Sequence, residues 1–356
     1  MEERKDLVEV SFKLSLEKHY DLLKEIIAVD KNVELNKEKV FNWAVENNNT
    51  KLVSLLIQIT DVTADDNYVI KVAAKEGYAE IVKQLIDAGA DLTADGNYAI
   101  RHAAENGRTE VVKLLIDAGA DLTANDNYAI KYAATWGRTE VVKLLIEKGA
   151  DVTADDNFAI KYAARCGYIE VVKLLIDAGA DVTAGNNWAI RYAAENGHTE
   201  TVKLLIEYGA DVTAQDNYAI RYAAEGGHTE VVKLLIDAGA DVTADCNWAI
   251  RYATENGHTE VVKMLIDAGT DVTAWGNDAI IRATINGHAE IVKLLIDAGA
   301  NVTANTIRYA EAYGHTEVAK MLIEARSDVD DYSIKSVFLD YISSQIRKLK
   351  NFLKNL

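Results

Sequence analysis

The stretch N-Y-A-I-R-Y-A-A-E-G-G-H-T-E-V-V-K-L-L-I-D-A-G-A-D-V-T-A-D-C, residues 217–246, decides the fold of this 356-residue chain, because nearly the same thirty residues recur along most of its length. An Asn opens each regular copy, at positions 67, 97, 127, 157, 187, 217, 247 and 277. A segment this short cannot bury its own apolar face, so successive copies must stack on one another. We therefore expect a solenoid with one long surface, an architecture that favours binding over catalysis.

Each copy is expected to fold as helix, turn, helix and loop. Asn217 has the side chain of a helix N-cap, residues 218–226 form a short alanine-rich helix, and Gly227 supplies the positive φ that ends it. Thr229 is placed to cap a second helix, which ends at Gly239 before the loop into the next copy. That helix is apolar except for a Glu-Lys-Asp stripe at positions 230, 233 and 237. It should be buried on most sides, and packing between copies should hold the chain together.

The copies diverge toward both ends of the chain. Residues 1–66 are predicted to form divergent N-terminal capping repeats, in which Asn48 replaces the turn glycine. Residues 67–304 form eight regular copies, and residues 305–330 a last copy that has lost three residues near the start of its first helix. Apolar residues at helical spacing in 331–356 predict an amphipathic helix. This helix would cap the last repeat; recruitment, dimerisation or a weak membrane contact are the open alternatives.

Composition narrows the class of protein. The net charge is -18, from 38 Lys and Arg against 56 Asp and Glu. Such a charge repels nucleic acid and anionic membranes and makes a basic patch on a partner the easier match. The charged start and the lack of a long apolar run predict neither a signal peptide nor a membrane span, hence an intracellular, cytoplasmic protein. Cys166 and Cys246 lie about three copies apart, roughly 25 Å, which is too far for a disulfide.

The run G-H-T-E-V-V-K-L-L-I-D-A-G-A-D-V-T-A, residues 227–244, resembles the second half of an ankyrin repeat, and the resemblance spans about residues 40–325. Where that family has T-P-L-H-x-A-A in a period of about 33, this chain has Y-A-I-R-Y-A-A at 218–224. The residues missing from each copy come from the loop. The resemblance therefore implies an all-α, ankyrin-like α-solenoid of stacked helix-turn-helix units with shortened or absent β-hairpin fingers. The thirty-residue variant looks like ankyrin proteins of giant, mimivirus-like DNA viruses.

No arrangement typical of catalysis or metal binding stands out. Histidines at 198, 228, 258, 288 and 315 form a column, but neighbours in it lie roughly 10 Å apart, whereas ligands sit about 2 Å from a zinc ion. They are expected to be turn residues that hydrogen-bond to nearby backbone. No nucleophile with an orienting partner, phosphate loop or Cys-x-x-Cys accompanies them. Neither enzyme activity nor a metal or other cofactor is expected.

Two columns of side chains run along the predicted first helices. One is aromatic, the other cationic: Tyr98, Tyr128, Phe158, Trp188, Tyr218 and Trp248, then Lys71, Arg101, Lys131, Lys161, Arg191, Arg221, Arg251 and Arg308. In ankyrin folds this helix lines the concave surface, and aromatics with arginine are typical of interface hot spots. The alternative is that the aromatics pack on the next repeat and the cations offset the loop aspartates. Columns this regular favour the alternative.

Departures from the repeat are better candidates for a partner site, because the scaffold does not require them. One group occupies the inter-helix turn of three consecutive copies: Arg108, Trp136, Arg138, Arg165, Cys166 and Tyr168. We interpret it as a site anchored by Trp136 and Tyr168, with neutral drift as the alternative. A second group departs within one copy, where decay near the end of the array is the favoured explanation: Trp275, Asp278, Arg282 and Ile285.

These observations favour a non-enzymatic scaffold that binds a partner protein through its concave face and inter-helix turns. The candidate partner-binding residues are Arg108, Trp136, Arg138, Arg165, Cys166, Tyr168, Trp188, Trp248 and Trp275. Neither nucleic acid, membrane nor a small-molecule substrate is expected as a ligand, and the chain should be a monomer. If the viral resemblance holds, the partner is a host factor in the host cytoplasm. The alternative function is a structural component that self-associates through its repeat ends or C-terminal helix.

Overall fold

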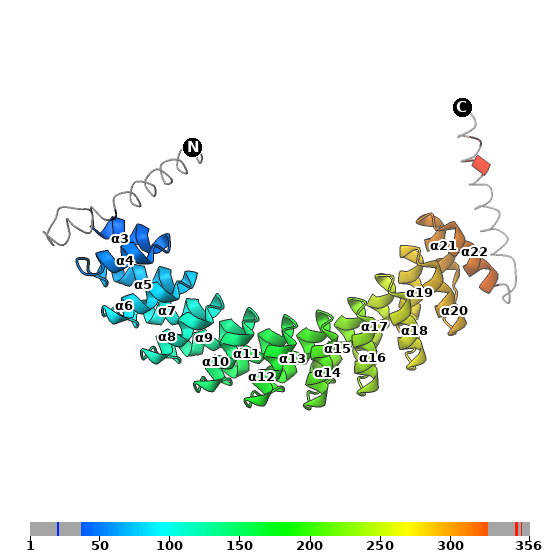
Figure 1. The fold of residues 1–356 in the computed structure, drawn as a ribbon. Coiled ribbons are helices and arrows are strands. Elements are labelled where there is room, and N and C mark those ends of the chain that lie inside the picture. The colour runs from blue at the N-terminus through cyan, green and yellow to red at the C-terminus, as the bar shows by residue number, and fades with distance from the viewer. Residues whose placement is uncertain (1–19, 21–36, 327–345, 348–349, 351–356) are drawn as a thin grey trace. The chain divides into compact units, whose positions relative to one another are not determined.

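The computed structural model describes residues 20, 37–326, 346, 347 and 350, which are drawn in colour in Figure 1. Over this part of the chain there are twenty helices and no strand, so the predicted all-α fold is confirmed for it. The apolar stretch 12–27 and the amphipathic stretch 331–356 lie outside the described residues, apart from those isolated positions. Their predicted capping roles remain predictions.

The helices alternate between a first and a second helix of each repeat. The first helices are α3 (Lys37–Glu46), α5 (Ala64–Glu76), α7 (Ala94–Glu105), α9 (Ala124–Thr135), α11 (Ala154–Arg165), α13 (Ala184–Glu195), α15 (Ala214–Glu225), α17 (Ala244–Glu255), α19 (Ala274–Asn286) and α21 (Ala304–Ala312). The second helices are α4 (Thr50–Leu56), α6 (Ala79–Asp87), α8 (Thr109–Asp117), α10 (Thr139–Glu147), α12 (Ile169–Asp177), α14 (Thr199–Glu207), α16 (Thr229–Asp237), α18 (Thr259–Asp267), α20 (Ala289–Asp297) and α22 (Thr316–Ala325).

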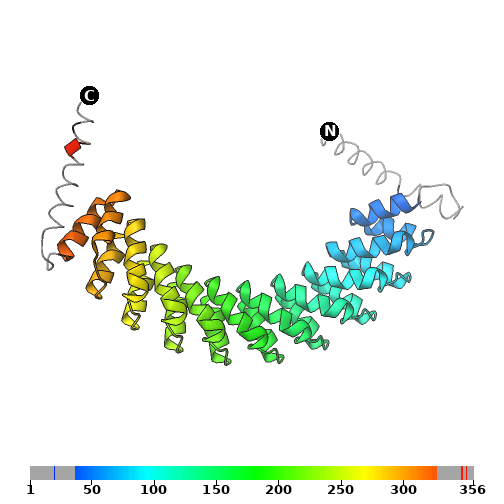
Figure 2. The same ribbon diagram turned by 180° about the vertical axis from the view of Figure 1, so that it is seen from behind.

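The chain divides into two compact units. Unit 1 comprises Met1–Ala163 with Glu170–Asp181, and unit 2 comprises Ala164–Ile169 with Val182–Leu356. In unit 1 the first helices α5, α7 and α9 pack side by side, as do the second helices α6, α8 and α10. In unit 2 the layers are α13, α15, α17 and α19 on one side and α14, α16, α18 and α20 on the other (Figures 1 and 2). Repeats therefore stack with like helix on like helix, as a solenoid requires.

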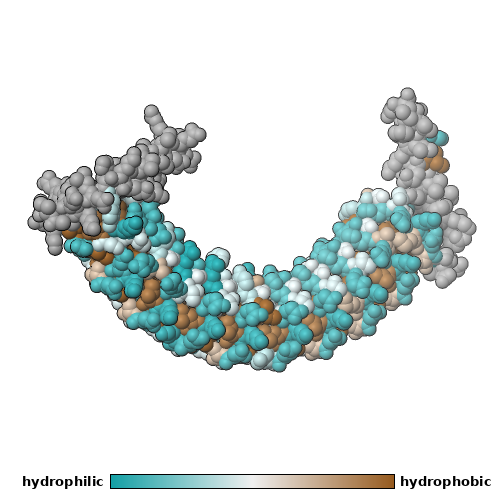
Figure 3. All heavy atoms as spheres, viewed as in Figure 1, coloured by the Kyte–Doolittle hydropathy of each residue, from teal (hydrophilic) through white to brown (hydrophobic). Residues whose placement is uncertain are grey.

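Small and branched apolar side chains fill the space between these layers. In the repeat of α15 and α16, Ile220, Ala223, Ala224, Val232 and Leu235 are all 0% exposed. The alanines let neighbouring first helices approach closely, and each buried Ile or Leu stabilises the stack by roughly 1.5–3 kcal/mol. On the surface, hydrophilic residues are interleaved with smaller hydrophobic groups (Figure 3). Packing between repeats is therefore the main source of cohesion.

The first helix begins differently from our prediction. Gln215, Asp216 and Asn217 have φ of 54°, 54° and 58°, so the chain makes one left-handed turn before the right-handed helix starts at Tyr218. Asn217 is not an N-cap; its Oδ1 accepts a 2.7 Å hydrogen bond from the backbone N–H of Asp241, in the loop that leads into the next repeat. The N-cap prediction was wrong because Asn is favoured both at caps and in the left-handed region.

A left-handed triplet opens all eight regular repeats. Asp, Asn or Gly fills its positions except at Gln215, Cys246 and Trp275. Other L-residues lose roughly 1–2 kcal/mol in this conformation, which explains the composition of the triplet. This compact turn stands where a β-hairpin finger would project, and no strand occurs in the described part of the chain. The expected shortening or loss of the finger is confirmed.

The last described repeat lacks the triplet. Thr303 has extended backbone angles, φ −105° and ψ 163°, and forms a capping box with Thr306 at the start of α21. The three residues missing from this copy are therefore those of the left-handed turn. Without them, the helix begins from an ordinary N-cap.

The inter-helix turn has the predicted left-handed glycine, but the second helix is not capped at the predicted residue. Gly227 has φ 72°, so the predicted left-handed glycine is confirmed. Asn48, which replaces this glycine in the first described repeat, has φ 53° and takes the same conformation. The residue that precedes α16 is His228, with φ −79° and ψ 75°, and Thr229 is already helical. The cap predicted at Thr229 was wrong because the capping position follows Gly227 directly, so that the helix begins one residue earlier than expected.

Candidate functional site

Aromatic rings on the first helices stack into a ladder within each unit. In unit 2 the rings of Trp188, Tyr192, Tyr218, Tyr222, Trp248 and Tyr252 follow one another at centroid distances of 4.1, 5.6, 4.1, 6.0 and 4.2 Å. In unit 1 the rings of Tyr98, His102, Tyr128, Tyr132, Phe158 and Tyr162 do so at 3.9, 5.8, 4.0, 5.9 and 4.1 Å. Sequence reasoning missed the second ring of each pair. The i, i+4 spacing of aromatics within one helix was the available signal.

The rings of the ladder pack against one another. Trp188 and Trp248, which we named as candidate partner-binding residues, are half-buried members of it. Aromatic pairs in such offset or tilted arrangements stabilise a fold by about 0.5–1.5 kcal/mol beyond their buried area. The geometry therefore agrees with the packing interpretation of the aromatic column.

The cationic column holds the left-handed turns. Arg101 donates from Nε to the carbonyl of Gly96 at 2.8 Å and from Nη2 to that of Asp95 at 2.7 Å. Arg221 reaches forward and pairs with the carboxylate of Asp245 in the next repeat. These cations satisfy backbone carbonyls and loop carboxylates, as the structural interpretation of the column expects.

Tyrosine hydroxyls also link neighbouring repeats. Tyr218 donates to Oε2 of Glu195 at 2.6 Å, and Tyr128 donates to Oε2 of Glu105 at 3.1 Å. The pKa of Tyr128 is raised to about 12, mainly by burial and next by the negative charge of the nearby Glu105 carboxylate. Burial and the hydrogen bond to Glu195 likewise raise the pKa of Tyr218. The hydroxyls thus stay protonated as donors across the ordinary pH range.

Trp248 departs from this pattern. It has no hydroxyl, and both its Nε1 and Oε2 of Glu225 are buried without a hydrogen-bond partner. A buried polar group left unpaired costs about 1–3 kcal/mol. Among the ladder residues, Trp248 is therefore the one whose identity the scaffold explains least.

Several side chains at one position of the inter-helix turns donate hydrogen bonds to backbone carbonyls of the preceding repeat. His228 does so from Nε2 to the carbonyl of Glu195 at 2.9 Å, and the equivalent histidines make the same bond: His198, His258, His288 and His315. Arg108 and Arg138 fill this position in earlier repeats and donate from Nε to backbone carbonyls at 3.0 and 2.9 Å. The backbone-bonding role predicted for the histidines is confirmed. Two of the candidate site residues therefore perform the histidine's structural role.

The other departures in the turns are exposed. Trp136 follows α9 and is 52% exposed, and Tyr168 is 37% exposed. Arg165 and Cys166 are exposed as well. The six residues fall into two groups, one in each unit: Arg108, Trp136 and Arg138 in unit 1, and Arg165, Cys166 and Tyr168 in unit 2.

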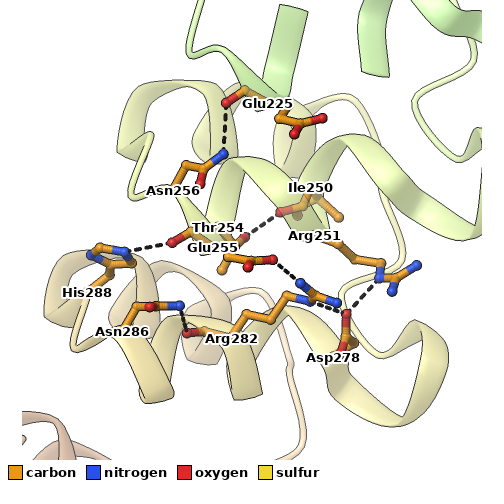
Figure 4. Close-up of polar contacts among 10 residues, drawn as sticks. All are labelled: Glu225, Ile250, Arg251, Thr254, Glu255, Asn256, Asp278, Arg282, Asn286 and His288. Carbon is orange, nitrogen blue, oxygen red and sulfur yellow. Dashed lines mark hydrogen bonds and ion pairs between the residues drawn. The ribbon is translucent and has the colours of Figure 1, made fainter. Parts of the chain in front are cut away.

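Asp278 and Arg282 replace the aromatic pair in α19 (Figure 4). Arg251 and Arg282 both donate from Nε to Oδ2 of Asp278 at 2.6 Å. Arg282 also pairs with Glu255, and its guanidinium lies 5.0 Å from the ring centroid of Tyr252. This connected network ends the ladder of unit 2. Whether the departure reflects decay of the repeat, the explanation that the sequence favoured, is not tested by these contacts, and decay stays a prediction.

Trp275 belongs to the same departure. It lies in the left-handed triplet with φ 54° and is 66% exposed. The Arg251 guanidinium lies 5.3 Å from its ring centroid. It is the most exposed of the large apolar side chains in the described part of the chain.

The described residues can also be examined for a metal site, a disulfide and a membrane-spanning helix. No group of three or more His, Cys, Asp or Glu among the described residues is arranged to hold a metal ion. Both cysteines are free and exposed, which confirms the prediction that they do not pair. In the stretch from 37 to 326 and at the isolated positions beyond it, no helix is long and apolar enough to cross a membrane.

Stacked helix pairs that present side chains along a surface define an α-solenoid repeat protein. The family model for ankyrin repeats (3 copies) matches the chain at residues 12–95, 70–156, 100–186, 154–216, 190–274, 220–306 and 250–333. The chain therefore belongs to the ankyrin-repeat family. A comparison with curated proteins finds no match. Ankyrin repeats are generally protein–protein interaction modules on a scaffold that is typically non-enzymatic.

Proposed function

We propose that the chain is a scaffold that binds a partner protein through its first-helix face and inter-helix turns, without catalysis. The observation that carries the proposal is Trp136, which is 52% exposed at a turn position where most other repeats have Asn or Gly. No hydrogen bond of the scaffold requires an indole there. Tryptophan is enriched among interface hot spots because it buries a large apolar area at one place.

The turns are also well prepared for binding. Side chains such as His228 and Arg138 tie their turns to the backbone of the preceding repeat, so the exposed residues beside them are held in place. Such preorganisation lowers the entropy lost on association. Arg165, Cys166 and Tyr168 supply the corresponding group in unit 2, and Trp188, Trp248 and Trp275 extend the proposed surface onto the first helices and their left-handed turns.

The proposal is tested by quantitative affinity capture with the wild-type chain and a Trp136→Asn variant. Asn fits this turn, because Asn106 occupies the same place one repeat earlier. We expect recovery of the principal partner to fall by at least about tenfold, the loss typical of a hot-spot residue. Lys203→Ala, on the exposed side of α14, is the matched control and should leave recovery unchanged. Equal recovery with and without Trp136 would remove the turn from the proposed surface.

We infer the cellular setting from the resemblance alone. A likeness to ankyrin proteins of giant DNA viruses supports a host protein as partner and the host cytoplasm as location. In this proposal the chain is a monomer, with residues 1–66 and 331–356 capping the two ends of the array. The alternative is a structural component that self-associates through its repeat ends or C-terminal helix. Light scattering separates the two, since a monodisperse monomer counts against assembly.

A further inference from the structure

The loops that follow the second helices of unit 2 are uniformly acidic. Residues 207–216, 237–246, 267–276 and 297–306 contain nine Asp or Glu and no Lys, Arg or His. All nine are exposed: Glu207, Asp211, Asp216, Asp237, Asp241, Asp245, Asp267, Asp271 and Asp297. We call this row of loops the acidic edge. A surface of one charge sign attracts a partner of the opposite sign.

Several of these carboxylates are fixed in orientation. Oδ1 of Asp211, Asp241 and Asp271 accepts both the backbone N–H and the hydroxyl of the Thr two residues later, at 2.7 to 2.9 Å. The Thr hydroxyl and then its N–H lower the pKa of each carboxyl, which keeps it ionised. These bonds use Oδ1 only. The edge therefore presents an ordered row of negative charges rather than freely rotating side chains.

Trp275 interrupts the acidic edge with an aromatic ring. It stands where the preceding repeat has Asp245, four residues after Asp271, and it is 66% exposed. Arg251 stacks over this ring, but the charge of Arg251 is compensated by Asp278 at 2.6 Å. An exposed indole beside carboxylates is a favourable place for a guanidinium, which stacks on aromatic rings and forms bidentate pairs with carboxylates.

We propose that the acidic edge of unit 2, centred on Trp275, docks an arginine-rich basic segment of the partner. One arginine stacks on the exposed part of the indole, and its neighbours pair with the carboxylates of Asp271 and Asp241. This inference rests on the proposed function and specifies the chemistry of the partner. Charge complementarity selects a basic segment over an acidic or purely apolar one.

The test uses the full chain and a fluorescein-labelled peptide of alternating Gly and Arg, followed by fluorescence anisotropy. Trp275→Gln should weaken binding about tenfold, in the range of an aromatic hot spot. Gln suits the turn because Gln215 occupies the same place with φ 54°. The double variant Asp241→Asn, Asp271→Asn keeps an oxygen for the Thr bonds and should also weaken binding and reduce its dependence on salt. Lys143→Ala, on the exposed side of α10 in unit 1, is the control and should bind the peptide like the wild type.

Besides failure of the Gly and Arg peptide to bind, three results would overturn the inference. One is unchanged affinity of Trp275→Gln, which would indicate diffuse attraction to an acidic protein. The second is equal binding of a Gly and Glu peptide, and the third equal binding of an uncharged apolar helical peptide. Failure here is distinguishable from failure of the proposed function. If the Gly and Arg peptide does not bind but capture still depends on Trp136, only the partner chemistry inferred here is wrong; capture that is insensitive to Trp136 contradicts the proposed function instead.

Discussion

Asn217 combines a backbone conformation with a hydrogen bond, and both depend on its short amide side chain. Its φ of 58° places it in the left-handed region, where Asn is tolerated better than most residues. Its Oδ1 accepts a hydrogen bond from the N–H of Asp241 at 2.7 Å, so that the loop leading into the next repeat is tied to the start of this one. Glycine would supply the first property without the second, and alanine would supply neither.

Two substitutions separate these contributions. Asn217→Gly should lower the free energy of unfolding by about 1–3 kcal/mol, because the N–H of Asp241 loses its acceptor. Asn217→Ala should lower it by roughly 1–2 kcal/mol more, because alanine is strained at this φ. Urea denaturation followed by circular dichroism measures both. If the two variants were equally stable, the backbone strain assigned to this position would be refuted.

The tyrosine-to-glutamate bonds make a second prediction at this scale. Tyr218→Phe should lower the free energy of unfolding by about 1–2 kcal/mol, since Glu195 would lose its donor. Trp248→Tyr should raise it by about 1 kcal/mol, since a hydroxyl would become available to Glu225, whose Oε2 is buried and unpaired. Denaturant titration of both variants is the measurement. A Trp248→Tyr variant no more stable than the wild type would show that the indole is as well accommodated as tyrosine.

At the scale of elements, the left-handed triplet separates this repeat from one built on a hairpin finger. It occupies only three residues, yet it turns the chain from the loop into the first helix and offers carbonyls to an arginine such as Arg101. The last described repeat, which lacks the triplet, begins its helix with the Thr303 capping box instead. The triplet is therefore a separable element of the repeat.

The Asp-x-Thr turns predict how stability depends on pH. Hydrogen bonds from Thr213 and Thr243 lower the pKa of Asp211 and Asp241, so the folded state favours their ionised form. The unfolded chain, whose aspartates have a pKa of about 3.9, takes up protons first as the pH falls. The stabilisation is complete above about pH 4 and is lost as the pH drops through the lowered folded pKa values.

The measurement is the thermal midpoint, Tm, between neutral and strongly acidic pH. The double variant Asp211→Asn, Asp241→Asn should show a smaller loss of Tm below about pH 4 than the wild type, because it lacks two of the titrating groups. Asp237→Asn, outside such a turn, serves as the control. If Tm fell as steeply below about pH 4 in the double variant as in the wild type, Asp211 and Asp241 would not be the groups responsible for the pH dependence.

At the scale of the whole molecule, charge is the property to which every repeat contributes. The net charge is -18, and self-repulsion of that size opposes compaction. We expect Tm to rise as salt increases from about 0.02 to about 0.15 M, because the screening length falls to about 8 Å. Scanning calorimetry tests this. A Tm that falls with salt would mean that ion pairs such as those of Arg282 outweigh the repulsion.

Much of the repeat could be predicted from residues alone. The structure agrees with the predicted helix pair, with the Ile and Ala core around Ile220, with the left-handed Gly227 and with the unpaired cysteines. The candidate site was anticipated less well. Arg108 and Arg138 were read as departures but act as substitutes for histidine, and the second row of aromatic rings was overlooked. Those roles depend on contacts with a neighbouring repeat, and the sequence of one repeat does not show such contacts.

The sequence by itself determined the period, the pairing of helices and the class of protein, because near-identical amphipathic segments in tandem can bury their apolar faces only by stacking. The tertiary structure decided what the polar positions do. Asn217 binds a residue 24 positions away, Tyr218 one 23 away and His228 one 33 away. Local propensity says nothing about such partners, since the same Asn can cap a helix or enter the left-handed region. Only the stacking of one repeat on the next selects between them.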